Sequence, residues 1–248
     1  MQAVYGLIGH PLGHSFSKEY FSQKFKDLGL ESTCCYDLFP LSAIEDFPQL
    51  LDTETNLKGL NVTIPYKTSV LQYVHAVDVS VQEIGAANVL KIDANKRIYA
   101  YNTDCIGFEK TFVPLLQVYH TKALIFGSGG AALAVAYILR KYNIEYTFVS
   151  RTSITTQSIR YDQVDAYIRK GYTVLINATP LGMFPQIDIG VPIDYRQINA
   201  KFLCYDLVYN PRMTKFLRLS QAQGATIKDG LDMLHFQADA AWEIWNRK

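Results

Sequence analysis

Residues 122–134 read KALIFGSGGAALA, and this stretch decides the fold. An uncharged apolar run ends at Phe126, the spacing Gly127-x-Gly129-x-x-Ala132 follows, and residues 131–142 then predict a helix. Gly127 permits a tight turn, Gly129 lets a pyrophosphate approach the backbone, and Ala132 allows the helix to pack closely on the strand. Strand, glycine-rich turn and helix in this order are typical of a dinucleotide site, with the phosphates at the amides of the helix N-terminus. The alternative is an ordinary turn in an α/β protein that binds no nucleotide.

The next predicted strand, residues 146–150, indicates which dinucleotide binds. An NAD site usually ends this strand with Asp or Glu, which binds the ribose 2′-hydroxyl. Here the strand runs into Arg151 and Thr152 and has no acid at its end. A guanidinium flanked by the hydroxyls of Ser150 and Thr152 suits a 2′-phosphate, so the cofactor is predicted to be NADP. The alternative is that Arg151 is a solvated loop residue.

Outward from this stretch, strand-like and helix-like segments alternate along the chain. Strands are predicted at 4–8, 35–39, 59–64, 87–92, 97–101, 123–126, 146–150, 173–177 and 202–207, and helices at 18–28, 43–51, 66–74, 131–142 and 231–246. The strands are mostly short apolar runs, as in a parallel sheet that helices cover on both faces. The predicted fold is α/β with two domains. Residues 1–103 form an α/β domain, 104–230 form a Rossmann-like doubly wound domain, and the helix in 231–248 packs back on the first.

The composition excludes several classes of protein. The chain has 248 residues, of which 49% are hydrophobic and 19% charged, so disordered and fibrous classes are excluded. Its formal net charge is +1, which implies neither a nucleic-acid nor a membrane partner. Residues 123–139 carry no charge, but this run falls short of the ~18–20 residues that a membrane span needs.

Cysteine and histidine usage predicts no metal site. The four cysteines show no CxxC spacing and no signal peptide precedes them, so we expect reduced thiols in the cytoplasm. His10 and His14 are four residues apart, but Pro11 and Gly13 lie between them and no carboxylate follows at ligand spacing.

The first half of the chain contains a candidate proton donor. Residues 59–67 read GLNVTIPYK, which places Lys67 at the predicted opening of a helix just after a strand. Asp104 lies at the predicted domain boundary, where a cleft would form. Reduction of a carbonyl needs a proton on oxygen as hydride reaches carbon, and a lysine held by an aspartate is a plausible donor. Taken alone, each residue is also compatible with a surface charge or a helix cap.

Eight segments in order resemble the motif series of shikimate 5-dehydrogenases and span nearly the whole chain. They are 9–17 (GHPLGHSFS), 61–67 (NVTIPYK), 102–104 (NTD), 127–130 (GSGG), 150–152 (SRT), 177–183 (NATPLGM), 205–211 (YDLVYNP) and 230–237 (GLDMLHFQ). The resemblance implies an NADP-dependent enzyme that interconverts 3-dehydroshikimate and shikimate, with a substrate domain, a Rossmann domain and a cleft between them. The enzyme is expected to be a monomer or homodimer with no nucleic-acid or membrane partner.

The resemblance also implies a role for individual residues. Lys67 and Asp104 would be the catalytic acid/base pair. Substrate would be bound by Ser15 and Ser17 at its carboxylate, by Thr63, Asn88, Asp104 and Gln237 at its hydroxyls, and by Tyr209, which would close the cleft. Ser17 is also compatible with a simple helix cap. Cofactor would be bound by Gly127, Ser128, Gly129, Gly130, Ala131, Ser150, Arg151, Thr152, Thr179, Met183, Val208 and Gly230.

One segment departs from the family pattern. Only 25 residues separate Arg151 from Asn177, where the family usually has a helix and a further strand, so one helix is expected to be missing. This puts in doubt the wall beside the adenosine and leaves the catalytic cleft intact. Two other functions stay open: a dehydrogenase of broader specificity that takes quinate or uses NAD, and a sensor that binds a metabolite without turnover. The presence of both Lys67 and Asp104 argues against a sensor.

Overall fold

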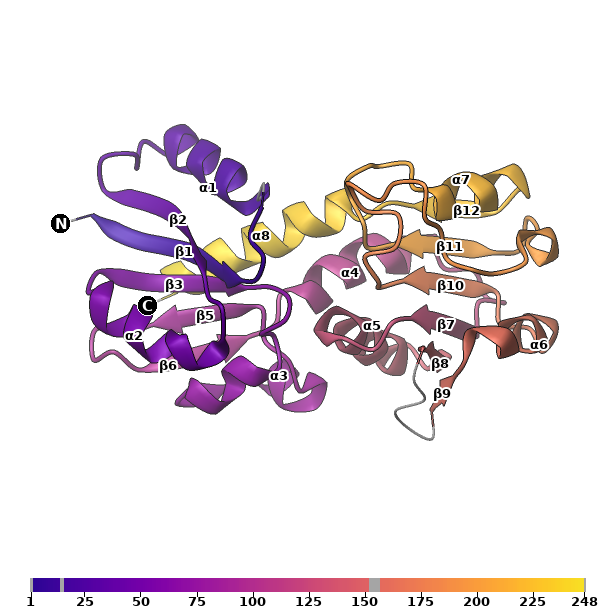
Figure 1. Ribbon diagram of the computed structural model, residues 1–248, viewed down its shortest axis with the longest axis horizontal. Coiled ribbons are helices and arrows are strands. Elements are labelled where there is room, and N and C mark those ends of the chain that lie inside the picture. The colour runs from indigo at the N-terminus through magenta and orange to yellow at the C-terminus, as the bar shows by residue number, and fades with distance from the viewer. Residues whose placement is uncertain (1, 14–15, 152–156, 248) are drawn as a thin grey trace. The chain divides into compact units, whose positions relative to one another are not determined.

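The computed structural model describes residues 2–13, 16–151 and 157–247 (Figure 1). By its contacts the chain forms two compact units, one made of residues 1–103 and 238–248 and the other of residues 104–237. The second boundary lies within the C-terminal helix, seven residues after its start at Leu231. Each unit contains one six-stranded sheet.

The first unit carries a mixed sheet with strand order β2-β1-β3-β5-β6-β4. β1 pairs in parallel with β2 and β3, β5 pairs antiparallel with β3 and β6, and β4 pairs in parallel with β6. The elements are β1 (Ala3–Gly9), α1 (Phe16–Asp27), β2 (Cys34–Pro40), η1 (Ile44–Asp46), α2 (Phe47–Thr53), β3 (Leu57–Val62), η2 (Ser69–Tyr73), β4 (Ala76–Val77), α3 (Val79–Ile84), β5 (Val89–Ile92) and β6 (Ile98–Tyr101). This pairing brings the ends of β1, β3 and β6 and the start of β5 to one edge of the sheet.

Helices cover both faces of this sheet. On one face, Tyr5 and Leu7 of β1 pack with residues of α1 and with the end of α8 (Leu231–Asn246). On the other face, Ile8 of β1 packs with Phe47 of α2 and Val70 of η2. Neighbouring residues of a strand point to opposite faces, so β1 contributes to both cores. The predicted return of the C-terminal helix to the first unit is confirmed, because Trp245 Nε1 donates to Leu90 O at 2.9 Å.

The second unit carries an all-parallel sheet with strand order β12-β11-β10-β7-β8-β9. Its elements are α4 (Asp104–Phe112), η3 (Val113–Leu115), β7 (Lys122–Phe126), α5 (Gly130–Lys141), β8 (Glu145–Val149), β9 (Ser158–Ile159), η4 (Tyr161–Gln163), α6 (Val164–Arg169), β10 (Val174–Asn177), η5 (Tyr195–Gln197), β11 (Leu203–Asp206), α7 (Lys215–Ala222), β12 (Thr226–Lys228) and the start of α8. The chain leaves β7 toward β8 on one side and later returns to β10 on the other. β7 and β10 therefore flank the point at which the strand order reverses.

Both faces of the second sheet are also covered. Val164 of α6 and Phe216 of α7 pack with Leu124 and Phe126 of β7 in one core. On the other face, Phe108 and Phe112 of α4 pack against the ring of Tyr205 on β11. The Tyr205 hydroxyl lies 2.6 Å from the hydroxyl of Thr111 on α4. This arrangement confirms the predicted α/β fold with a doubly wound parallel sheet.

The structure corrects one predicted helix and adds elements that the sequence did not reveal. The helix predicted at 66–74 is wrong, because this segment forms a turn at Lys67 and then the short 3₁₀-helix η2. Its β-branched residues Thr68, Val70 and Val74 disfavour an α-helix. The elements that the prediction omitted are β4, α3, α4, η3, β9, η4, α6, η5, α7 and β12. All of them except α4 have eight residues or fewer, so their periodicity is weak.

The short segment between Arg151 and Asn177 contains both a strand and a helix. β9 pairs with β8, and the six residues of α6 lead into β10. Residues 152–156 of this segment lie outside the described part of the chain, so the expectation that one helix is missing stays a prediction.

One strand of the first sheet tolerates no side chain where α8 crosses it. A Cβ placed on Gly59 would lie 2.3 Å from Nε1 of Trp245, which is itself held by its hydrogen bond to Leu90. We expect Gly59→Ala to lower the free energy of unfolding by about 1–3 kcal/mol, because the buried indole has no room to shift. Urea unfolding measures the change. Gly13→Ala is the matched control, since a Cβ there meets nothing within 4 Å, and equal stability of the two variants would contradict the prediction.

Candidate functional site

Polar residues gather at one edge of the first sheet. Thr63 and Lys67 follow β3, Asn88 precedes β5, and Thr103 follows β6. Asn88 is 2% exposed, and its side chain donates to Thr103 Oγ1 at 3.0 Å and accepts from Thr103 N at 2.6 Å. Antiparallel pairing of β5 with both β3 and β6 produces this meeting, because it places the start of β5 between the ends of its neighbours.

The segment that carries Lys67 is held to the same edge by its backbone. The carbonyl of Lys67 accepts from Ala87 N at 2.7 Å, and Tyr66 N donates to Thr63 O at 2.9 Å. The Lys67 side chain is half-buried. Lys67 and Asn88, which are 21 residues apart in the sequence, thus lie on neighbouring segments of the chain.

Of the two predicted carboxylate-binding serines, Ser17 is the second residue of α1. Ser15 lies outside the described residues. Ser17 makes a side-chain hydrogen bond with Tyr36, whose hydroxyl donates to Asn61 Oδ1 at 2.7 Å. Burial raises the pKa of Tyr36 well above its usual value, so this phenol stays protonated and remains a donor. Asn61, which the sequence analysis did not assign, therefore connects Ser17 with β3.

Three further predicted residues belong to the second unit. Asp104 is the first residue of α4, follows Thr103 directly and is 2% exposed. Tyr209, after β11, and Gln237, within α8, are both half-buried.

The glycine-rich turn of the second unit has the geometry that its sequence predicts. Gly127 has φ +102°, a value that favours glycine, and its amide donates to Val149 O at 2.9 Å. Gly129 precedes α5, and a Cβ there would meet nothing within 4 Å. The exposed backbone at Gly129 and the first amides of α5 thus form an open cradle that Ser128, Gly130 and Ala131 extend. This cradle suits a pyrophosphate, which needs close approach and N–H donors.

The segment after β8 carries the predicted 2′-phosphate residues. Ser150 is 8% exposed, and its amide donates to Ile159 O at 3.0 Å. Arg151 is exposed. Burial raises the pKa of the Tyr161 phenol, and the positive charge of Arg151 partly offsets this rise. Thr152 lies outside the described residues.

The segments after β10, β11 and β12 supply the remaining predicted cofactor residues. The Thr179 hydroxyl donates to Asn177 Oδ1 at 2.6 Å, and Met183 is 41% exposed. The carbonyl of Val208 accepts from Gly230 N at 3.1 Å. A Cβ on Gly230 would lie 2.2 Å from Leu207 O, so glycine is required at this close approach of two loops.

A buried carboxylate between these segments escaped the sequence analysis. Asp206, the last residue of β11, is fully buried, and burial raises its pKa to about 7. Its oxygens accept hydrogen bonds from Asn177 Nδ2 at 2.9 Å, Val208 N at 3.0 Å and Thr214 Oγ1 at 2.6 Å. The signal in the sequence was an acid closing an otherwise uncharged strand, LCYD.

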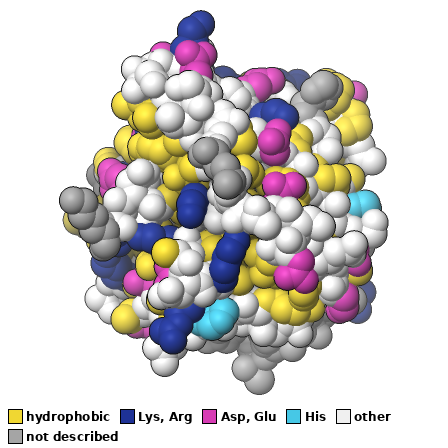
Figure 2. All heavy atoms as spheres, turned by 90° about the vertical axis from the view of Figure 1, so that its left-hand side faces the viewer, with side chains coloured by type: hydrophobic (Ala, Val, Ile, Leu, Met, Phe, Trp, Pro, Cys, Tyr) yellow, Lys and Arg dark blue, Asp and Glu magenta, His cyan; other side chains and the backbone are white. Residues whose placement is uncertain are grey.

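One depression of the second unit lies away from both of these edges. A depression of about 680 Å³ lies where β10 and β11 begin, lined by residues such as Thr173, Asp194 and Phe202, and contains none of the predicted site residues. Figure 2 shows one face of the molecule with basic and acidic side chains interspersed. Among residues 2–13, 16–151 and 157–247, no three His, Cys, Asp or Glu side chains are grouped as a metal site would require. In the same part of the chain, no helix has the length and apolarity to cross a membrane.

Comparison with known proteins identifies the family. The family profile described as "Shikimate dehydrogenase substrate binding domain" matches residues 7–90. A shikimate dehydrogenase (NADP⁺) of Methanococcus maripaludis is 35% identical over 98% of this chain and 91% of its own length. The chain belongs to the shikimate dehydrogenase family.

Solved structures of this family have the same fold. A chorismate mutase/shikimate 5-dehydrogenase fusion protein of Clostridium acetobutylicum aligns with a TM-score of 0.86 and 36% identity, over 99% of this chain and 92% of that one. A shikimate 5-dehydrogenase of Thermus thermophilus, crystallised with NADP(H) and shikimate, aligns with a TM-score of 0.83 and 28% identity over 99% and 93%. The family membership suggested by the eight motifs is thus confirmed.

The raised pKa of Asp206 predicts a pH-dependent stability. The folded state binds the proton more tightly than the unfolded state, whose Asp has its ordinary pKa of 3.8. The stability from this group is therefore full below pH 4 and is lost as pH rises through 7. We expect the free energy of unfolding of the wild type to fall by about 4 kcal/mol between pH 4 and pH 8 relative to that of Asp206→Asn, whose side chain cannot titrate. Urea unfolding across this pH range gives the stability of both proteins, and parallel pH profiles would contradict the raised pKa of Asp206.

Proposed function

We propose that this chain catalyses the reversible NADP-dependent reduction of 3-dehydroshikimate to shikimate. The observation that carries the proposal is identity of 35% over nearly the full length to a relative named shikimate dehydrogenase (NADP⁺). The polar edge of the first sheet and the phosphate cradle of the second support it, because a hydroxylated acid and a dinucleotide need these two chemistries. The test is an initial-rate panel of shikimate and quinate, each with NADP and with NAD. Preference for quinate or NAD would favour the broader dehydrogenase, and binding of shikimate without turnover would favour a sensor.

Lys67 is the proton donor in this proposal. When NADPH is bound, its nicotinamide supplies the hydride to the substrate carbonyl carbon. The oxygen then gains negative charge and needs a proton, which the Lys67 ammonium provides in reduction and takes back in oxidation. The bond from Ala87 N to Lys67 O supports this role, since it fixes the backbone from which the amine extends. Asp104 completes the acid/base pair and also accepts a hydrogen bond from a substrate hydroxyl.

In this proposal the remaining polar residues of the predicted site bind the substrate. Ser15 and Ser17 hold its carboxylate, and Thr63, Asn88 and Gln237 hold its hydroxyls. Asn88 suits this role because its hydrogen bonds with Thr103 fix the orientation of its amide. Tyr209 is the last of the proposed substrate-binding residues.

NADP binds at the carboxyl edge of the second sheet. The amides of α5 and the open backbone at Gly129 take the pyrophosphate, and Arg151 with Ser150 and Thr152 takes the 2′-phosphate. Thr179, Met183, Val208 and Gly230 contact the opposite end of the cofactor. The enzyme works in the cytoplasm as a monomer or homodimer, and its four cysteines, all thiols, support a reducing compartment.

Removing the Lys67 amine tests the acid/base assignment. We expect Lys67→Ala to lower kcat by about 10²–10⁴-fold and to change KM for shikimate only modestly, because the lost interaction forms with charge that develops in the transition state. Asp104→Ala should change both constants, since its carboxylate also holds substrate. Steady-state rates of shikimate oxidation give the values. Lys58→Ala, an exposed lysine on β3, is the control, and a Lys67→Ala enzyme as fast as that control would exclude the role.

Arg151 tests the choice of cofactor. A charge-assisted bond to the 2′-phosphate has no counterpart in NAD, so Arg151→Ala should raise KM for NADP by about 10–100-fold and hardly change KM for NAD. Rates with each cofactor at saturating shikimate measure the effect. The control is Arg169→Ala, an exposed arginine that ends α6. Equal losses with both cofactors would show that Arg151 supports the fold rather than reading the phosphate.

A further inference from the structure

The carboxylate of Asp206 connects three chain segments at the carboxyl edge of the second sheet. Its Oδ1 accepts from Asn177 Nδ2, at the end of β10, and from the amide of Val208. Its Oδ2 accepts from the hydroxyl of Thr214, the residue that caps α7 by accepting from Leu217 N. One buried side chain thus contacts the loops after both β10 and β11 and the start of α7.

Through Asn177, this carboxylate fixes the loop after β10. The Asn177 amide uses Nδ2 for Asp206 and for Leu181 O at 3.1 Å, and its Oδ1 accepts from the amide and hydroxyl of Thr179. The Thr179 oxygen in turn accepts from Leu181 N at 3.2 Å. An amide with both ends engaged cannot rotate freely, so the orientation of Thr179 depends on the Asn177–Asp206 bond.

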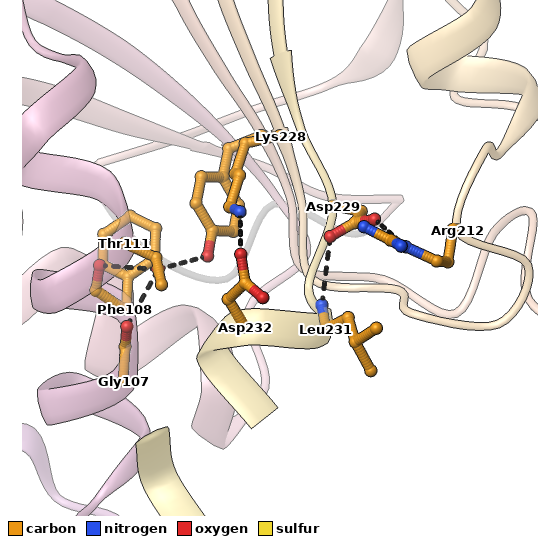
Figure 3. A network of polar contacts seen from close by, with 9 residues as sticks. Gly107, Phe108, Thr111, Arg212, Lys228, Asp229, Leu231 and Asp232 are labelled. Atoms are coloured by element: carbon orange, nitrogen blue, oxygen red, sulfur yellow. Dashed lines mark hydrogen bonds and ion pairs between the residues drawn. The ribbon is translucent and has the colours of Figure 1, made fainter. Parts of the chain in front are cut away.

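The loop after β11, which carries Tyr209, is held at both ends. Asp206 binds its beginning at Val208 and its end at Thr214. Between them, Arg212 Nε donates to Asp229 Oδ2 at 2.8 Å, and Asp229 Oδ1 accepts from Leu231 N, where α8 begins (Figure 3). The Arg212 side chain is 67% exposed, so solvent screens this outer pair, whereas the bonds of Asp206 are fully buried.

The burial of Asp206 is costly and calls for a function. A carboxylate without a paired cation loses several kcal/mol of hydration on burial, and none of the ion pairs among the described residues includes Asp206. An apolar residue at the end of β11 would avoid this cost but could not accept three hydrogen bonds. Buried polar networks of this kind are typical of sites that need a fixed geometry.

Strand order decides which end of the dinucleotide these loops meet. The pyrophosphate cradle follows β7, and Arg151 follows β8 on one side of it. β10 and β11 lie on the other side of β7, so the loops that Asp206 connects face the nicotinamide half.

We propose that Asp206 is the positioning residue for the nicotinamide half of NADP, acting by holding the Thr179 loop and the Tyr209 loop in one arrangement. This inference rests on the proposed function. A positioning role predicts an effect on one half of the cofactor only. A general contribution of Asp206 to the stability of the unit would affect the binding of both halves.

A fragment of the cofactor separates these two roles. Adenosine 2′,5′-bisphosphate carries the 2′-phosphate and the adenosine but lacks the nicotinamide. We expect Asp206→Ala to weaken NADP binding by about tenfold or more, to leave the affinity for the fragment within about twofold of wild type, and to leave the NADP/NAD preference unchanged. Calorimetric titration with each ligand, which needs no turnover, measures the three values. Equal weakening of fragment and NADP would overturn the proposal, as would wild-type affinity for NADP.

Thr214 provides a second route to the same test in case Asp206→Ala does not fold. Thr214→Val removes the donor to Oδ2 with little change of shape, and Thr214→Ser restores it. We expect the Val variant to lose NADP affinity about threefold to tenfold with the fragment unaffected, and the Ser variant to bind as wild type does. The control is Thr173→Val, at the opposite edge, because the Thr173 hydroxyl is buried and makes no hydrogen bond with any residue that the structure describes. Val and Ser variants that bind NADP equally would overturn the proposal.

Titration of wild type distinguishes failure of this inference from failure of the proposed function. If wild type binds neither NADP nor the fragment, the proposed function fails, and Asp206 has no cofactor to position. If wild type binds NADP and oxidises shikimate while the variants lose affinity for both ligands alike, the function stands and the inference fails.

Discussion

The level at which the parallel strands end determines where the chemistry of the second unit can be. Phe126 is in register with Val149 and Asn177, and Asn177 with Asp206, so β7, β8, β10 and β11 stop at one line. The backbone ladder continues one residue further, where Gly127 N, Ala178 N and Leu207 N each donate to the neighbouring strand. Loops that leave the sheet from a common line must face the same space. The glycine-rich turn after β7, the segment after β8 that carries Arg151, and the loops after β10 and β11 therefore share one edge because of strand pairing.

The first unit reaches a common edge by a different route. Its β5 runs antiparallel to β3 and β6, so the start of one strand lies between the ends of two others. This is why Asn88, which precedes a strand, lies beside Thr103, which follows one. The hydrogen bonds between them turn a loop amide into a fixed donor and acceptor, and the bond from Ala87 N to Lys67 O joins the third segment to the pair.

In both units, the loop geometry at this edge is fixed by buried polar side chains. Asn88 and Asp206 are nearly inaccessible to solvent, yet each is satisfied by several hydrogen bonds. Such groups lower the free energy gained from burial but restrict the backbone to one arrangement. Tyr36 serves the same purpose near α1, where its raised pKa keeps the phenol protonated as the donor to Asn61.

The sequence by itself determined the α/β class, the dinucleotide turn, the family and the order of the motifs, because these depend on local spacing and apolar runs. The turn at Gly127 could be predicted because glycine adopts a positive φ without steric strain, and Gly127 has such a φ. Only the tertiary structure decided that Lys67 lies in a turn before η2, because tertiary packing as well as local helix propensity determines the conformation of this segment. Only the tertiary structure decided that Asp206 is buried. Burial depends on which strands become neighbours and which helices cover them. Those contacts join residues far apart in the chain, such as Asn177 and Asp206, and no local pattern encodes them.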